Sequence, residues 1–274
     1  MGTTPHLPGG TLVGVTSGAD PEHRSGAQSV ERALAVLRAI DEAEDGLGVS
    51  EIAQRRGLSV STAHRLTRVL CDAGLVSQDP RTDRYQLGPA LVVLGRRAEE
   101  RLGYRPALPE LEKLADATGE SVNLGIRAGN DVLVVLDVTS RQPLRFDQAA
   151  GSRVPLHTSA MGKCLLAFGT SLGGAVESLP ELRPVTPSTI TDRDALRREL
   201  EQVRGRGWAV NDEERTPGVR AVAAPVVAER LAIAAIAVQG PTIRLPDGRI
   251  NDLGGEIAAT AARLAPLLAG HGLS

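Results

Sequence analysis

The sequence has few cysteines, few aromatic residues and no long apolar run. Its two cysteines, Cys71 and Cys164, are far apart and lack metal-ligand spacing, which argues against a disulfide framework and a zinc cluster. The longest apolar stretch, Leu231 to Val238, is much shorter than the roughly 20 residues that a membrane helix needs. Residues 1–26 lack the basic and apolar parts of a secretory signal and are rich in Gly, Pro, Ser and Thr. We therefore expect a disordered tail over residues 1–26, a cytoplasmic protein and no membrane partner.

An excess of charge of either sign is also missing. The formal net charge of the 274 residues is −2, and 42% of the residues are hydrophobic. This composition is typical of globular proteins and excludes nucleic-acid binding through bulk charge, so any basic site must be local. The length suits two domains.

Two helices are predicted directly after the tail. Apolar residues recur at helical spacing behind Ser29, a suitable N-cap, and the expected buried positions are Val30, Leu34, Leu37 and Ile40. Ser50 is expected to cap a short second helix over Glu51–Arg56, with Ile52 and Ala53 on its apolar face. Gly57 should end that helix and allow a tight turn.

A third helix and a small hairpin complete this region. The helix is expected from Val60 to Ala73, with a buried stripe of Ala63, Leu66, Leu70 and Ala73. Two β-like runs, 75–78 and 84–87, flank a polar turn at 79–83. Residues 27–88 thus predict a winged helix-turn-helix, in which the second helix of the pair enters the major groove of double-stranded operator DNA.

Charge and side-chain length support this interpretation. Residues 54–84 hold six arginines and three acids, a local net charge of +3. Short hydroxyl side chains at the start of the third helix let the backbone approach phosphates, and longer basic side chains can reach base edges. The residues expected to contact DNA are Ser59, Ser61, Thr62, His64, Arg65, Arg68, Arg81 and Arg84. The alternative is a helical hairpin whose arginines are merely solvated.

The remainder predicts a linker helix over 89–104 and a second domain over 105–274. Helices are expected near 108–120, 160–168, 192–206 and 251–269. Short alternating or apolar runs at 121–129, 131–140, 143–149, 221–227 and 231–238 predict an antiparallel sheet. The overall fold class is therefore α+β with two domains.

Six segments together resemble one protein family in sequence and in order. They are "SVERALAVLRAID", "SEIAQRRGLSVSTAHRLTRVLCDAGLV", "YQLGPALVVLG", "LPELEKLADATGESVNLGIR", "VPLHTSAMGKCLLAFG" and "GWAVNDEERTPGVRAVAAPV" with "IAAIAVQGP". They resemble the IclR family of bacterial transcriptional regulators. The resemblance implies a second domain with a curved antiparallel sheet similar to GAF domains, a homodimer that often pairs into a homotetramer, and ligand-responsive DNA binding, more often repression than activation.

The resemblance also implies a pocket for a small-molecule effector, commonly a carboxylate. The matching positions are Ser159, Ala160, Met161, Asn211, Ala221, Ala237 and Gln239, with Leu144, Phe146 and Val154 as apolar walls. Independently of the family, "HTSAMGK" begins a helix whose first N–H groups can bind a carboxylate, and Lys163 adds charge there. In the better-known glyoxylate-binding pattern of the family, acidic, Cys and Ser side chains occupy the positions that are Asn211, Ala221, Ala237 and Gln239 in this sequence. Glyoxylate, an aromatic acid and a hydroxy acid therefore all stay open.

Two other functions compete with this interpretation. An enzyme could use His157, Ser159 and Lys163, but the segment fails the phosphate-loop pattern because no Ser or Thr follows the lysine. Metal binding by the acids of "NDEERTPG" is a minor hypothesis, since such a loop is more often solvated or paired with arginine. A dimerising DNA-binding protein without a ligand is the third possibility. We expect no catalytic residue, no metal and no cofactor.

Overall fold

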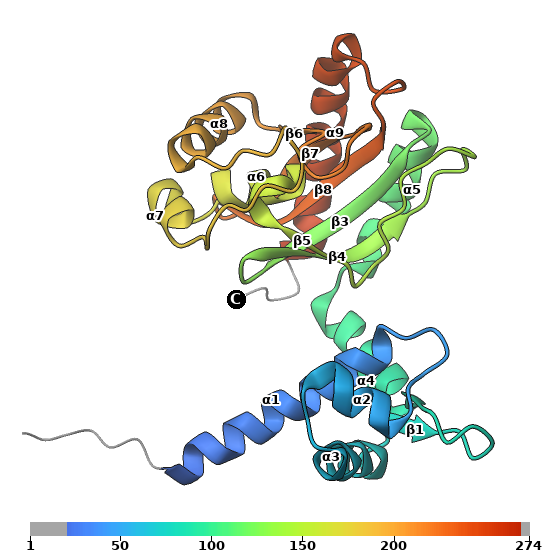
Figure 1. The fold of residues 1–274 in the computed structure, drawn as a ribbon. Coiled ribbons are helices and arrows are strands. Elements are labelled where there is room, and N and C mark those ends of the chain that lie inside the picture. Colours follow the sequence, from blue (N-terminus) through green and yellow to red (C-terminus); the bar gives the residue numbers. More distant parts are fainter. Residues whose placement is uncertain (1–20, 270–274) are drawn as a thin grey trace, which may run out of the picture. The chain divides into compact units, whose positions relative to one another are not determined.

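The computed structural model describes residues 21–269, and the chain divides between Arg96 and Arg97 into two compact units (Figure 1). The expected tail lies mostly outside the described residues. Its last residues, 21–26, are already helical, because the first helix begins at Pro21 rather than at Ser29.

The first unit is a three-helix core followed by a hairpin. Its elements are α1 (Pro21–Asp41), α2 (Val49–Arg56), α3 (Val60–Asp72), β1 (Val76–Gln78) and β2 (Tyr85–Leu87). The two strands pair antiparallel, and Leu47 bridges to Tyr85 in front of α2. Helix α4 (Ala90–Leu102) follows, and the division between the two units falls inside it. Buried apolar residues of all three helices and both strands form one core: Val36, Ala39, Ile40, Ile52, Ala53, Ala63, Leu66, Leu70, Val76 and Tyr85.

The predicted buried stripe of the first helix is partly wrong. Val30 and Leu34 are 60% and 50% exposed, whereas Val36, Ala39 and Ile40 are buried. The reason is length: α1 starts well before the three-helix core, and only its part from Ala33 onward packs against α2 and α3.

Glycines form both ends of α2, and the sequence predicts only one of them. Gly48, not Ser50, is the N-cap of α2, and the Glu51 carboxylate accepts its N–H at 2.7 Å. Gly57 ends α2 with φ +61°, a conformation that glycine adopts without strain. Ala73, expected in the stripe of α3, is instead its exposed C-cap residue.

The second unit is a six-stranded antiparallel sheet with helices on both faces (Figure 1). The strand order is β5 (Arg153–Pro155), β4 (Asp131–Val138), β3 (Ser121–Ala128), β8 (Leu231–Pro241), β7 (Val219–Ala228) and β6 (Ala209–Asp212). The helical elements are η1 (Arg105–Ala107), α5 (Leu108–Thr118), η2 (Leu156–Thr158), α6 (Ala160–Ala167), α7 (Leu172–Glu177), α8 (Arg193–Arg206) and α9 (Asp247–Ala269).

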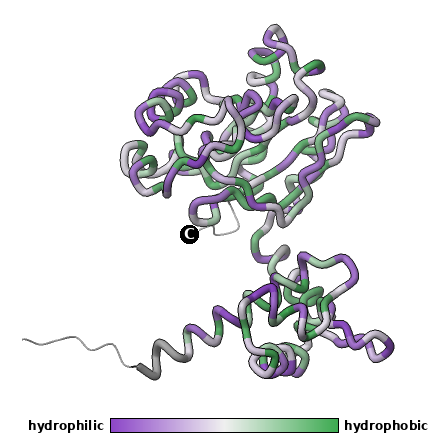
Figure 2. Tube along the Cα trace, in the orientation of Figure 1, coloured by the Kyte–Doolittle hydropathy of each residue, from purple (hydrophilic) through white to green (hydrophobic). Residues whose placement is uncertain are grey.

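Alternation along the strands divides the core into two layers. Val222 and Ala224 of β7 pack with α5 and α9, whereas Ala221 and Ala223 pack with α6 and α8. Helix α6 is buried along its whole length, and the hydrophobic colour in Figure 2 runs through it and the central strands. The face of the sheet under α6 therefore lies inside the unit.

One predicted strand is absent, and the structure contains strands and a helix that were not predicted. Residues 143–149 form no strand, because β4 pairs on that side with β5 through Asp131–Leu133 and the chain between them loops out. Strands β5 and β6 and helix α7 were not predicted. Within residues 21–269, no helix combines the length and hydropathy that a bilayer span requires.

Candidate functional site

Helix α3 begins with a cluster of hydroxyl groups. Ser59 is the N-cap, and its Oγ accepts the N–H of Thr62 at 3.2 Å. The same Oγ lies 2.8 Å from Thr62 Oγ1 and 3.1 Å from Ser61 Oγ. These small polar groups leave the first turn of α3 open to an incoming phosphate.

The solvent face of α3 carries basic side chains that make no polar contact of their own within the described part of the first unit. His64, Arg65 and Arg68 are exposed, and no hydrogen bond or ion pair of their side chains exists within the described residues. Thr67, on the opposite face, is buried and donates to the carbonyl oxygens of Ala63 and His64 at 3.1 and 3.0 Å. The core thus fixes the helix while its arginine face stays available.

The two arginines of the hairpin have different roles. Arg81 is 87% exposed at the turn and lies 3.7 Å from Asp79 Oδ1. Arg84 donates to the carbonyl oxygens of Asp45 and Gly46 at 3.1 and 3.0 Å and pairs with Glu51 at 3.0 Å. Arg84 therefore fastens the hairpin to the start of α2.

The same contacts fix the ionisation of Glu51. The Gly48 N–H, and then the Arg84 guanidinium, hold the pKa of Glu51 below its usual value. The carboxylate stays charged and keeps the cap and the hairpin connected.

In the second unit, the strand residues expected at an effector site share one face of the sheet. Asn211, Ala221 and Gln239 are direct cross-strand partners on β6, β7 and β8. Ala237 lies in the next row, between Ala223 and Asn123. This face is the one that α6 covers.

The start of α6 is held tightly against that face. Ser159 is the N-cap, accepts the N–H of Gly162 at 3.1 Å and donates to the Pro155 carbonyl at 3.2 Å. Asn211 Nδ2 donates to the Thr158 carbonyl at 2.7 Å. Ala160 and Met161 are buried, and N–H groups of a first helical turn have no acceptor within the helix.

Lys163 does not add a free charge to this site, contrary to expectation. Its ammonium is buried, pairs with Glu214 at 2.5 Å and donates to the Val210 carbonyl at 3.0 Å. Burial raises the pKa of Glu214, while Lys163 opposes that rise. The pair joins α6 to the loop behind β6.

The expected apolar walls are unequal. Val154 is fully buried in the core under α6, Leu144 is 63% exposed, and Phe146 is half-buried with the Arg215 guanidinium 5.9 Å from its ring centroid. Three polar residues near Phe146 were not predicted. Arg215 contacts the Phe146 ring and Gln148, and Gln148 accepts a hydrogen bond from Asn123 through its backbone carbonyl oxygen. For Asn123 a signal existed, since it is a polar residue among the buried positions of an apolar strand.

The side chains of the enzyme hypothesis have separate partners. His157 Nε2 lies 3.2 Å from the Arg183 carbonyl, Ser159 caps α6, and Lys163 pairs with Glu214. Burial lowers the pKa of His157. In the described part of the chain no hydrogen bond joins these three side chains, as a nucleophile and its base require.

The acidic side chains at the end of β6 and directly after it also have partners within the second unit. Asp212 pairs with Arg220 at 2.8 Å, Glu213 accepts the Gly218 N–H at 2.6 Å, and Glu214 pairs with Lys163. The described residues contain no cluster of three His, Cys, Asp or Glu side chains arranged for a metal.

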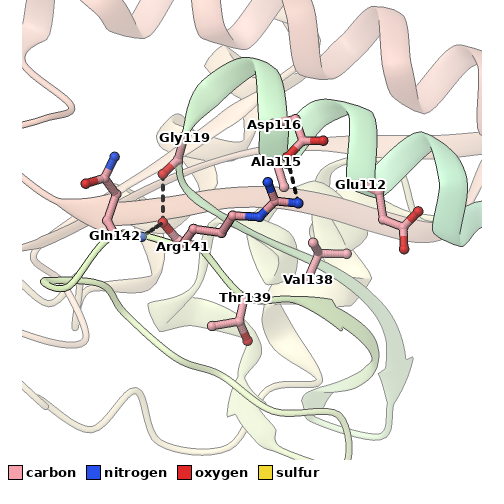
Figure 3. Close-up of a pocket in the computed structure, with 9 residues that line it drawn as sticks. Glu112, Ala115, Asp116, Gly119, Val138, Thr139, Arg141 and Gln142 are labelled. Atoms are coloured by element: carbon pink, nitrogen blue, oxygen red, sulfur yellow. Dashed lines mark hydrogen bonds and ion pairs between the residues drawn. The ribbon is translucent and has the colours of Figure 1, made fainter.

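A depression of about 510 Å³ lies elsewhere, between α5 and the end of β4 (Figure 3). Asp116 and Arg141 face each other across it at 3.7 Å, and both are largely exposed. None of the residues expected to contact DNA or an effector lines it.

Comparison with known proteins covers both units. Residues 29–80 match the model of the IclR helix-turn-helix domain, and residues 104–265 match the bacterial transcriptional regulator IclR C-terminal model. The HTH-type transcriptional regulator BhcR of Paracoccus denitrificans is 36% identical over 255 residues, 92% of this chain and 91% of the relative. The HTH-type transcriptional repressor AllR of Salmonella typhimurium is 32% identical over 91% of this chain and 93% of its own. The crystal structure of an IclR transcriptional regulator from Alicyclobacillus acidocaldarius matches with a TM-score of 0.76 and 29% identity, over 88% of this chain and 98% of that one.

Proposed function

The chain belongs to the IclR family of bacterial transcriptional regulators, and from this premise we propose that it represses genes by binding operator DNA. A small metabolite that binds the second unit would raise or lower the affinity for the operator. The relatives named above are regulators, and one of them is a repressor. Repression is therefore the direction that we infer.

The observation that carries the DNA-binding part is the free cationic face of α3. His64, Arg65 and Arg68 have no partner in the described chain, so their donors are available to base edges and phosphates. Ser59, Ser61 and Thr62 lie at the start of the same helix, and Arg81 extends from the hairpin turn. Arg84 is left out of this set because its guanidinium already binds Asp45, Gly46 and Glu51.

The effector part is supported by the common face of the sheet. Asn211, Ala221 and Gln239 form one cross-strand row, and the first turn of α6 lies over the sheet beside them. Together with Ala237, Ser159, Ala160 and Met161 they define the effector site that we propose. Val154 packs in the same core as Ala221 and Ala237, and we include the half-buried Phe146 as a second wall, whereas the exposed Leu144 would have to move inward to contribute.

Two copies of the chain would bind a pseudo-palindromic operator, since each copy presents one α3 and operator symmetry mirrors protein symmetry. An effector then changes operator affinity only by as much as it prefers one arrangement of the two DNA-binding units over another.

The test is a titration of operator DNA with an Arg65→Ala variant. The probe is a labelled duplex from the region upstream of the gene, followed by fluorescence anisotropy. Loss of an arginine contact to a base should weaken specific binding by about 1–3 kcal/mol, or roughly 5- to 150-fold, with little change in binding to random duplex.

The control is Arg183→Ala, which removes an 83% exposed arginine from the second unit. It should bind the operator like the wild type. Equal affinity of Arg65→Ala and wild type for the operator would contradict the proposed role of α3.

A further inference from the structure

Arg215 is a partly buried cation without an anion. Its guanidinium donates to Gln148 Oε1 at 2.6 Å and stands over the Phe146 ring, and within residues 21–269 no carboxylate forms an ion pair with it. Burial lowers the pKa of Arg215. A guanidinium has five N–H donors, and the described chain supplies an acceptor for one of them. A charge removed from water without a counter-ion is unfavourable, so this arrangement favours an anion beside it.

Gln148 adds an unpartnered donor at the same place. The residue is 7% exposed, and its amide nitrogen Nε2 is buried without a hydrogen-bond partner. The orientation of the amide is settled by chemistry, because a guanidinium only donates and must therefore face the amide oxygen. The Nε2 group, bonded to the same carbon as Oε1, is therefore a second buried donor close to Arg215 that lacks an acceptor.

Both residues are held in position before any ligand arrives. Glu214, next to Arg215, pairs with Lys163 of α6, its N–H is accepted by Asn211 Oδ1 at 2.9 Å, and its carbonyl accepts the Thr189 hydroxyl at 2.6 Å. On the other side, Asn123 Nδ2 donates to the Gln148 carbonyl at 2.8 Å. Preorganised donors lose little entropy on binding a ligand.

These contacts also connect the two donors to the proposed effector site. Asn123 accepts a hydrogen bond from Gln239, a member of the cross-strand row under α6. The loop that carries Gln148 therefore lies over the same face of the sheet as Asn211 and Ala237.

We propose that Arg215 and Gln148 bind the acidic group of the effector, a role that neither the sequence pattern nor the family resemblance assigned to these two residues. The Arg215 guanidinium supplies charge and paired N–H donors, and Gln148 Nε2 supplies one further N–H to the same anion. This inference rests on the proposed effector-responsive function and assigns the polar end of its ligand.

The experiment measures binding of four acids, each beside its uncharged primary amide, to the purified full-length chain by calorimetry. The acids are glyoxylate, glycolate, pyruvate and benzoate. At least one acid should bind the wild type, with its amide about 10-fold weaker or worse, because a hydrogen bond to a charged group contributes at least that factor. Arg215→Gln and Gln148→Met should each weaken that acid by about 10-fold or more, whereas the exposed Arg183→Gln should not.

Operator binding is measured in parallel, so that failure of the inference and failure of the proposed function can be told apart. Arg215→Gln should bind the operator like the wild type while the acid no longer changes that binding. Unaltered acid affinity in both variants would overturn the inference. So would a wild type that binds none of the four acids, or that binds each no better than its amide, even if operator binding persists.

Folding of the variants is checked by thermal melting and by Trp208 fluorescence. If Arg215→Gln does not fold, Arg215→Lys and Gln148→Met decide by the same criterion. Lysine keeps the charge but not the paired donors, so it should retain part of the acid affinity.

Discussion

Lys163→Met removes the cation of the buried ion pair while keeping an unbranched side chain. The side chains of Lys163 and Glu214 are 2% and 8% exposed, and their charged atoms are 2.5 Å apart. Removing one partner of a buried pair destabilises a protein by about 3–5 kcal/mol, because the other charge stays in a medium of low dielectric. Glu199, 3.9 Å from Lys163, has the same sign as Glu214 and cannot replace the lysine. We expect the free energy of unfolding of the second unit to fall by this amount at neutral pH.

The assay is urea unfolding followed by the fluorescence of Trp208, the single tryptophan of the chain. Its ring packs against Gly254 and lies 4.5 Å from the Arg206 guanidinium, so it reports on the second unit. In the wild type, burial raises the pKa of Glu214 and Lys163 opposes it. In the variant the opposing effect of Lys163 is lost, and among the described residues a backbone hydrogen bond with Asp212 is the one lowering influence on the pKa of Glu214 that remains.

The pH dependence of the variant follows from that rise. Between the unfolded and the folded pKa of Glu214, the folded state binds a proton that the unfolded state does not, so stability falls as pH increases through this interval. The loss relative to the wild type should therefore be smaller at about pH 5 than at about pH 8.

The double variant Lys163→Met/Glu214→Gln is the control, since it removes both charges and should recover much of the loss. A loss below about 1 kcal/mol that is equal at both pH values would refute the reasoning, because only a solvated pair behaves in that way.

Three other predictions concern the hairpin turn, Gly162 in the first turn of α6 and the two thiols. Arg81→Ala should lower the slope of log affinity against log salt for DNA by about 1 while changing sequence preference little; an unchanged slope in anisotropy titrations would argue against a phosphate contact. Gly162→Ala would place a Cβ 2.1 Å from the Leu156 carbonyl oxygen, and we expect a loss of about 1–3 kcal/mol or more in urea unfolding. Gly173→Ala, with open space around the new Cβ, should cost nothing, and equal effects of the two substitutions would contradict the packing described here. Complete burial raises the pKa of Cys164 to about 12, so a thiol reagent near neutral pH should modify Cys71 alone in the folded protein; rapid reaction of both thiols would contradict this.

Local patterns predicted most of the first unit. The spacing of Ile52 and Ala53, the stop at Gly57 and the polar turn between two short β-like runs each depend on neighbours in sequence, and the structure confirms them. The buried face of α1 was predicted less well, because Val30 and Leu34 fit a helical stripe but lie beyond the core that would cover them.

Long-range pairing accounts for what sequence reasoning missed. The sequence predicts Arg84 as a DNA-contacting residue of the hairpin, but it does not predict the hydrogen bonds of Arg84 to the carbonyl oxygens of Asp45 and Gly46. The sequence similarly predicts an unpaired charge on Lys163 at the start of a helix, whereas in the structure Lys163 forms an ion pair with Glu214, which is distant in sequence. Gln148 and Arg215 come from separate loops that meet only in the fold. Periodicity carries no information on such partners.

The most direct test of the account compares affinity for the upstream duplex with affinity for a random duplex of equal length at one moderate salt concentration. Specific sites are typically bound about 10³-fold or more tightly than non-specific DNA, and we predict a preference of at least this order for the full chain. It should fall steeply in Arg65→Ala. Equal affinity of the wild type for the two duplexes, with and without the four acids, would contradict the claim that the α3 face recognises operator DNA.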